Sequence, residues 1–318
     1  MSAPELDVLS FGEALVDFFP ERPGVPLVEC DVFHRHLGGA PANVAVGLAR
    51  QGARVGLMTL VGPDDFGAFV RKQLAAEGVD VAGVGTHRTA KTGVTFVAVG
   101  ARGERSFLFF RHPSADQLIA EHDVDPALVA RARVLHVGSS TLAREPARAA
   151  TWKALDAARA AGRLISSDPN WRAHLWDDPR EALPLMQQLL QRCHIVKISD
   201  DELQPLVGTT DVEAAADRVR ALGCALVVIT LGARGCYFSS AAGAAYLPGE
   251  RVEVVDTTGA GDAFMAGLLA ELSARFAEGR ALADLSRDEL AAACARGNRL
   301  GALATTTLGA TAALKRVA

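Results

Sequence analysis

Several features that would assign the chain to a class of protein are scarce or absent. Its 318 residues include five cysteines, which are scattered singly with no C-x-x-C pair, and the N-terminus shows no basic segment followed by an apolar one. No apolar run approaches the ~18–20 residues needed to cross a bilayer. The nearest run, 224–231, is typical of a buried strand. We therefore expect a cytoplasmic protein with reduced cysteines and no membrane contact.

An excess of basic charge is also absent. Lys and Arg number 33 against 37 for Asp and Glu, so the formal net charge is −4 and the isoelectric point is near 6.1. Proteins that bind nucleic acid need a basic patch or stripe, which this composition does not favour. We expect no nucleic-acid partner, and any attraction of an anionic ligand must come from a few local groups.

Two common nucleotide-binding loops are missing. The P-loop string G-x-x-x-x-G-K-[ST] occurs nowhere, and the first predicted strand leads into Phe11-Gly12-Glu13 instead of G-x-G-x-x-G. The second absence argues against a dinucleotide-dependent oxidoreductase, although such an enzyme would have a similar sheet. A nucleotide would have to be held by other loops.

The most informative stretch that is present is 255–264, Val-Asp-Thr-Thr-Gly-Ala-Gly-Asp-Ala-Phe. Its glycines and adjoining small residues favour a tight turn over 257–261. From Ala263 onward, apolar residues recur at four-residue spacing, which predicts a helix. The sequence thus places an acid, Asp262, at the opening of a helix behind a turn of small residues.

This arrangement suits the handling of phosphate. The backbone N–H groups of Gly259, Ala260 and Gly261 would point outward at the helix N-terminus, where the helix dipole favours an anion. Asp262 is suited to taking a proton from a hydroxyl that attacks a phosphoryl group, while the anion hole receives the developing charge. The competing interpretation is that Asp262 is only a first-turn acid favoured by the dipole.

A second glycine-rich block, 38–52, reads Gly-Gly-Ala-Pro-Ala-Asn-Val-Ala-Val-Gly-Leu-Ala-Arg-Gln-Gly and predicts a turn, a helix and a glycine C-cap. Together with the later block, it resembles the two signatures of the ribokinase-like sugar kinases, also called the phosphofructokinase B family. Matching strings cover almost the whole chain: FGEALVD at 11–17, FRHPSAD at 110–116, DPNWR at 168–172, KISDDE at 197–202 and TLGARG at 230–235. FRHPSAD and DPNWR are most similar to fructokinases.

The order of apolar runs predicts the fold. Buried strands are expected at 6–11, 55–61, 134–137, 164–168, 195–198 and 225–230, and helices at 67–77, 148–161, 179–191 and 212–222. A repeating strand–helix order indicates one α/β domain over 1–318, with a mostly parallel, doubly wound sheet flanked by helices, which is also the ribokinase-like fold that the resemblance implies. Regions 18–37 and 92–111 break this order and predict a small antiparallel β lid, with a turn at 100–103. In the resembled family such a lid covers the sugar and often forms a dimer contact.

The resemblance implies a sugar site in the N-terminal half. Asp17 stands where a family carboxylate binds sugar hydroxyls, although a solvated loop acid is the simpler alternative. Asn43 has an alternative as a helix N-cap. Guanidinium groups match phosphate, and a surface position is their alternative; we favour Arg172 over Arg111 for the transferred phosphate. The sugar candidates are Asp17, Gly38, Gly39, Asn43, Arg111 and Asp262, and the catalytic candidates are Asp262, Gly259, Ala260, Gly261 and Arg172.

The nucleotide site is expected in the C-terminal half, where 230–235 ends a predicted strand with a glycine turn. Ser199 and Glu202 occupy the positions of the family's Asn-x-x-Glu motif, whose glutamate orients water around nucleotide-bound Mg²⁺. The serine departs from this motif and leaves an ATP contact at 199 open; the same residues also form a good capping box. Lys197 would supply charge to the phosphates. The nucleotide candidates are Lys197, Ser199, Glu202, Thr230, Gly232, Gly235, Gly259, Gly261 and Asn298.

Metal sites leave weaker traces in this sequence. By resemblance, a K⁺ site is expected at Asp256, Thr258, Ala304 and Gly309, where relatives bind a monovalent cation through oxygen atoms. His34 and His36 form an H-x-H pair without a third ligand nearby, so we expect them on the lid without a metal.

The resemblance implies an ATP-dependent sugar kinase that uses Mg²⁺, and D-fructose, giving fructose 6-phosphate, is the first expectation. Family members with similar motifs phosphorylate 2-keto-3-deoxygluconate, nucleosides or other sugars, so these acceptors remain alternatives. A sensor without catalytic activity is disfavoured, because a pure binder has no use for a base at Asp262. Besides sugar and ATP, the expected partner is a second copy of the chain, bound through the lid.

Overall fold

A nine-stranded sheet forms the centre of the computed structural model, which describes residues 5–22, 24–99, 105–111, 113–176 and 178–314. Its order is β13-β12-β11-β10-β9-β8-β1-β4-β5. In this order, all neighbouring strands between β11 and β5 pair in parallel. The pairs β11–β12 and β12–β13 are antiparallel. The strands are β1 (Leu6–Phe11), β4 (Val55–Val61), β5 (Val84–Thr86), β8 (Ala132–Val137), β9 (Leu164–Ser167), β10 (Ile195–Ser199), β11 (Leu226–Thr230), β12 (Cys236–Ser240) and β13 (Gly243–Leu247). The predicted mostly parallel sheet is confirmed.

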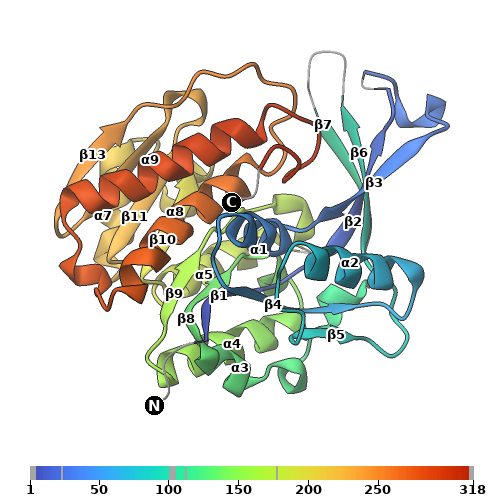
Figure 1. Ribbon diagram of the computed structural model, residues 1–318, viewed down its shortest axis with the longest axis horizontal. Helices are drawn as coiled ribbons and strands as arrows, with labels where there is room; N and C mark the ends of the chain where they lie inside the picture. The colour runs from blue at the N-terminus through green and yellow to red at the C-terminus, as the bar shows by residue number, and fades with distance from the viewer. Residues whose placement is uncertain (1–4, 23, 100–104, 112, 177, 315–318) are drawn as a thin grey trace.

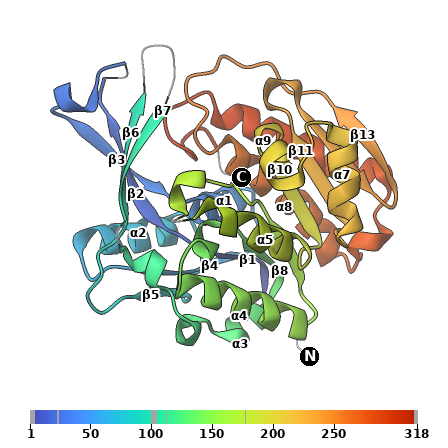
Figure 2. The same ribbon diagram turned by 180° about the vertical axis from the view of Figure 1, so that it is seen from behind.

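Helices cover both faces of this sheet because its strands are apolar on both faces. On β11, Leu226 and Val228 join one core while Val227 and Ile229 join the other, and all four are fully buried. The first face carries α1 (Ala40–Arg50), α2 (Asp65–Ala76), α8 (Ala260–Ala277) and α9 (Arg287–Ala304), seen in Figure 1. The second carries α3 (Pro126–Arg131), α4 (Ala147–Ala160), α5 (Pro179–Leu190), α6 (Leu203–Val207) and α7 (Val212–Ala221), seen in Figure 2.

A smaller sheet of order β3-β2-β6-β7 projects beyond the main sheet and forms the predicted lid (Figure 1). Its strands are β2 (Leu15–Pro20), β3 (Phe33–Gly38), β6 (Val94–Val99) and β7 (Arg105–Phe110). The pairs β2–β3 and β6–β7 are antiparallel as expected, but β2 and β6 run parallel, because both strands lead away from the main sheet. His34 and His36 lie on β3, and the turn predicted at 100–103 lies outside the described residues.

Parallel strands end at one edge of the sheet, and this edge faces the lid. The loops after β1, β8, β9, β10 and β11 therefore open side by side at the place where ligands bind in doubly wound sheets. The N-terminus of α8 lies at the same edge.

Two further observations bear on the chemistry of the chain. All five cysteines are free thiols. Among the helices of the described ranges, none combines the length and the apolar character that a bilayer span requires.

Candidate active site

A cavity of about 1000 Å³ lies between the lid, the strand ends and the start of α8. Its wall joins segments from both halves of the sequence. It includes most of the predicted site: Asp17, Gly39, Arg111, Arg172, Lys197, Ser199, Glu202, Thr230, Gly232, Gly235, Thr258, Gly259, Ala260, Gly261, Asp262 and Asn298. The remaining predicted residues, Gly38, Asn43, Asp256, Ala304 and Gly309, lie outside this lining.

The turn before α8 is tighter than expected. The helix begins at Ala260 and not at Ala263, with Gly259 as its N-cap at φ 73°. A side chain at Gly259 would collide with Ala310, so the close approach of the C-terminal loop requires glycine there. Asp262 consequently lies in the first turn of α8 and is 7% exposed.

Asp262 is oriented by an amide from the other glycine-rich block. Asn43 Nδ2 donates a hydrogen bond to Asp262 Oδ2 at 2.8 Å. The N-cap interpretation of Asn43 is wrong, because Gly39, at φ 98°, starts the helix earlier and leaves Asn43 inside α1. Burial raises the pKa of Asp262 to about 7, against the Asn43 hydrogen bond, which favours the charged form. A carboxylate with this pKa can accept a proton near neutral pH.

A buried ion pair lies beneath the same turn. Lys197 Nζ is 2.8 Å from Asp168 Oδ2, and both side chains are almost fully buried. A Cβ placed on Gly261 would lie 2.8 Å from Lys197 Nζ, so the ammonium lies directly against the predicted anion hole. Burial alone would lower the pKa of Lys197, but the attraction of Asp168 and Glu202 outweighs it and raises the pKa. The lysine therefore stays charged.

Asp168 is a cavity residue that the sequence analysis did not single out. Its Oδ1 is buried and has no hydrogen-bond partner among the described residues. The only signal was its place at the start of the DPNWR string, as the last residue of the predicted strand 164–168.

Glu202 is held by the predicted capping box. Its Oε2 accepts hydrogen bonds from Ser199 N at 2.9 Å and Ser199 Oγ at 2.6 Å, and its Oε1 accepts from Trp171 N at 2.5 Å. No group of three acids, histidines or cysteines in the described part of the chain forms a metal site by itself. Carboxylate oxygens of Glu202 and Asp168 in the wall fit Mg²⁺ that arrives with a nucleotide and keeps most of its water.

The side of the cavity that was predicted to bind the sugar is rich in acids. Asp17 lies on β2 and not in a loop, and a side chain at Gly38 would collide with its carboxylate. Burial raises the pKa of Asp17 to about 7, against the attraction of Arg111. Two further acids were not predicted from the sequence. Glu13 lines the cavity and accepts a hydrogen bond from the hydroxyl of Ser140, and Asp116, which is not part of the lining, pairs with Arg111.

The two arginines differ in their surroundings. Arg111 is buried in its ion pair with Asp116, whereas Arg172 is exposed on the cavity wall. The sequence did not show that Arg111 would be the buried one, because its partner is brought to it by the fold of the loop after β7.

The residues expected to bind K⁺ form one loop cluster. Asp256 Oδ1 accepts from Thr258 N at 3.0 Å and Thr258 Oγ1 at 2.8 Å, and its Oδ2 accepts from Gly309 N at 2.9 Å. Asp256 N donates to Thr305 O at 3.0 Å, next to Ala304 at the end of α9. The structure thus brings the four residues together behind the predicted anion hole. Asn298 Nδ2, on α9, donates a hydrogen bond at 3.1 Å to the carbonyl of Pro248, the residue that follows β13.

Comparisons with known proteins agree with this geometry. The profile of the pfkB family carbohydrate kinases matches residues 5–316. Fructokinase-1 of Oryza sativa subsp. japonica is 42% identical over 265 residues, which cover 82% of this chain and 81% of the relative.

Two solved structures show a similar fold. A fructokinase double mutant from Vibrio cholerae O395, with fructose, ADP and a potassium ion bound, aligns with a TM-score of 0.85 and 33% identity, covering 99% of this chain and 97% of the other. Aminoimidazole riboside kinase from Salmonella enterica, in complex with aminoimidazole riboside and an ATP analog, aligns with a TM-score of 0.83 and 34% identity, covering 97% and 96%.

Proposed function

Because the chain belongs to the pfkB family of carbohydrate kinases and is therefore a sugar kinase, we propose that it transfers the γ-phosphoryl group of ATP to D-fructose, giving fructose 6-phosphate and ADP. The observation that carries this proposal is a single cavity in which Asp262 lies between an acid-rich sugar side and the loops after β10 and β11. The 42% identity to a plant fructokinase supports fructose as the acceptor.

The proposed chemistry begins at two acids. Asp17, on the lid, binds sugar hydroxyls, and Asp262 takes the proton of the 6-hydroxyl as its oxygen bonds to the γ-phosphorus and the bond to ADP breaks. Residues 259–261 line the cavity at the start of α8. Their N–H groups receive the charge that develops on the phosphoryl group, which requires Ala260 N to release its 3.3 Å hydrogen bond to Thr257 O. Lys197 adds its positive charge from beneath the turn.

Two predicted sugar residues act indirectly in this proposal. Gly38 leaves room for the carboxylate of Asp17, and Asn43 orients Asp262. Gly39 and Arg111 line the cavity itself, so that they are placed to contact the sugar. Arg172 is exposed on the wall, where a flexible guanidinium is free to reach the transferred phosphate. An Arg172→Met variant with unchanged kcat would remove this last assignment.

The nucleotide occupies the other end of the cavity in this proposal, against Thr230, Gly232, Gly235 and Asn298. Mg²⁺ neutralises phosphate charge when bound with ATP, and Glu202 orients its water. The hydroxyl of Ser199 already donates to Glu202, so its role is to hold that acid. K⁺ binds at the loop cluster of Asp256, where it would stiffen the anion-hole turn.

A panel of acceptors tests the proposal. ADP release from ATP is measured with fructose, ribose, 2-keto-3-deoxygluconate, adenosine and aminoimidazole riboside. The last is included because a kinase of that riboside aligns as well as a fructokinase does. We expect fructose to have the highest kcat/KM. A tenfold lower kcat/KM for fructose than for another acceptor, about 1.4 kcal/mol of transition-state preference, contradicts the proposal.

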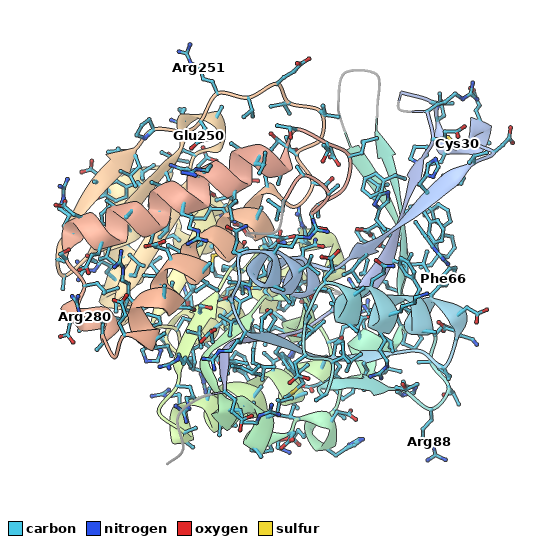
Figure 3. All side chains as sticks on the ribbon, viewed as in Figure 1. Cys30, Phe66, Arg88, Glu250, Arg251 and Arg280 are labelled. Carbon is cyan, nitrogen blue, oxygen red and sulfur yellow. The ribbon has the colours of Figure 1, made fainter. Side chains whose placement is uncertain are left out.

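The lid also supports a homodimer. Its face opposite the cavity carries a cluster of aromatic rings, in which Phe96 contacts Phe18, Phe33 and Phe110 with centroids 5.1–5.8 Å apart. Phe110 is 59% exposed and Leu108 beside it is 50% exposed. Figure 3 shows Phe66 of α2 near the base of the lid, where it covers one end of the cluster. We propose that a second copy of the chain covers the rest.

Two broader proposals remain. The chain forms one kinase domain with the lid inserted in it, because the cavity draws its wall from both halves of the sequence. It functions in the cytoplasm, because all five cysteines are free thiols, as expected in a reducing compartment. Trapping and counting free thiols in protein from freshly lysed cells tests the second statement, and an intramolecular disulfide would contradict it.

A further inference from the structure

One arginine lies buried among acids at the sugar side of the cavity. Arg111 directly follows β7, and its side chain is 6% exposed. Its Nη2 pairs with Asp116, whose side chain is 1% exposed and whose other oxygen accepts a hydrogen bond from Ser114 Oγ at 2.6 Å. Arg111 Nε is buried and donates to none of the described residues. The guanidinium is therefore fixed by Asp116, and Arg111 lines the cavity wall.

Further carboxylates face the same guanidinium. Burial alone would lower the pKa of Arg111, but the attraction of Asp116, Glu13 and Asp17 outweighs burial and raises the pKa. Glu13 is itself buried, lines the cavity and accepts a hydrogen bond from the Ser140 hydroxyl. The charge of Arg111 is thus cancelled by Asp116. Burial raises the pKa of Glu13 and raises that of Asp17 to about 7, so these two acids carry less negative charge near neutral pH than exposed acids would.

The other basic residues of the cavity wall do not change this balance. Lys197 is paired with Asp168 beneath the anion hole. Arg172 and Arg251 are exposed, and Figure 3 shows Arg251 at the outer edge of the molecule. An anionic group that entered the sugar side would lose its hydration and meet an Arg111 whose charge is already balanced by Asp116.

We propose that Asp116 and Glu13 make the acceptor site selective for uncharged sugars, because they cancel the charge with which Arg111 would otherwise bind a sugar acid. Arg111 then serves as a donor to sugar hydroxyls, and Asp116 is a positioning residue that acts through it. The inference rests on the proposed sugar kinase activity. It also explains why a buried arginine is compatible with a neutral substrate.

The test compares a neutral and an anionic acceptor in the full-length protein. Wild type, Asp116→Asn and Glu13→Gln are assayed for kcat/KM with fructose and with 2-keto-3-deoxygluconate. Binding of D-gluconate and of fructose is measured separately by calorimetry. Asp7→Asn is the matched control: it removes a carboxylate from the Arg54 pair at the opposite end of β1. Circular dichroism verifies that each variant is folded.

We expect wild type to prefer fructose by at least about 100-fold. Asp116→Asn and Glu13→Gln should each reduce this preference at least about tenfold and strengthen gluconate binding by a similar factor, because they free the charge of Arg111. Asp7→Asn should leave both ratios within about twofold of wild type.

Three outcomes would overturn the inference. The first is a wild-type enzyme that uses 2-keto-3-deoxygluconate as efficiently as fructose. The second is an unchanged preference and unchanged gluconate binding in Asp116→Asn. The third is an unchanged preference and unchanged gluconate binding in Glu13→Gln. This outcome decides the inference if Asp116→Asn does not fold. If no sugar is turned over by wild type, the proposed function fails separately, and gluconate binding alone decides the inference.

Discussion

Asn43 Nδ2 and Asp262 Oδ2 lie 2.8 Å apart, although 219 residues separate them in the sequence. The hydrogen bond joins the first turns of α1 and α8 and so connects the two glycine-rich blocks. The helices approach closely enough that a Cβ on Gly47 would lie 2.6 Å from the Ala266 side chain. An amide fixed in α1 thereby sets the orientation of the acid that we propose as the catalytic base.

Replacing the proposed base separates its two interpretations. Asp262→Asn should lower kcat by roughly 10²–10⁴-fold, the usual range for loss of a general base, while the dissociation constants of ATP and fructose change little. If Asp262 were only a first-turn acid that is favoured by the helix dipole, the variant would lose about 0.3–1 kcal/mol of stability and keep its turnover. Measuring kcat, both dissociation constants and the thermal midpoint decides between the two, and a near-normal kcat rejects the catalytic role.

The rate should depend on pH through Asp262. A base must be ionised, so kcat/KM should rise with pH around the pKa of about 7. The Asn43 hydrogen bond stabilises the ionised form, so Asn43→Ala should move the midpoint to higher pH. A pH–rate profile of both proteins measures the shift. A midpoint that moves downward, or not at all, would contradict the proposed role of Asn43.

The same acid should make stability depend on pH. Because burial raises the pKa of Asp262 from 3.8 to about 7, the folded state binds more protons than the unfolded state between these values. The free energy of unfolding of wild type should therefore fall, relative to Asp262→Asn, as pH rises from 4 to 7, by up to about 4 kcal/mol. Urea denaturation of both proteins at several pH values measures the difference; a constant difference would show that this pKa is not raised.

Metal ions should act at two places. Removing Mg²⁺ with EDTA should abolish turnover, because Lys197 alone supplies too little positive charge for the phosphates of ATP.

K⁺ should raise the thermal midpoint of wild type more than Na⁺ does, and Asp256→Asn should lose this difference. Thermal melts in the two salts test the site without an activity assay. Identical melts of wild type in K⁺ and Na⁺ would remove the K⁺ site from the proposal.

The lid face should determine the oligomeric state. Phe110→Asp places a charge in the exposed aromatic cluster and should convert a dimer into a monomer, because a buried, unpaired carboxylate is costly in an interface. Leu183→Asp, on the exposed side of α5, is the control and should leave the dimer intact. Light scattering coupled to size-exclusion chromatography measures both masses. A wild-type monomer, or a dimer in Phe110→Asp, would contradict the lid interface.

The sequence by itself determined the parts of this protein that depend on local order. A short run of consecutive apolar residues, such as Val55–Val61, is typical of a strand that is buried on both faces. Such a run can be recognised from adjacent residues alone. The small residues before Asp262 could be recognised because a tight turn and a helix N-terminus are local structures. The two blocks, the order of elements and the position of the lid followed from the same kind of evidence.

Only the tertiary structure decided which side chains meet. Asp116 neutralises Arg111, and Asp168 holds Lys197 beneath Gly261. Asn43, which was expected to reach the sugar or to cap a helix, donates to Asp262. The helix α8 begins at Ala260, whereas the sequence predicted a start at Ala263, and the C-terminal loop packs against its N-cap, Gly259. The contacts of Asp168 with Lys197 and of Asn43 with Asp262 join residues that are 29 and 219 positions apart. The energies of these contacts depend on burial and distance, which a local pattern does not contain.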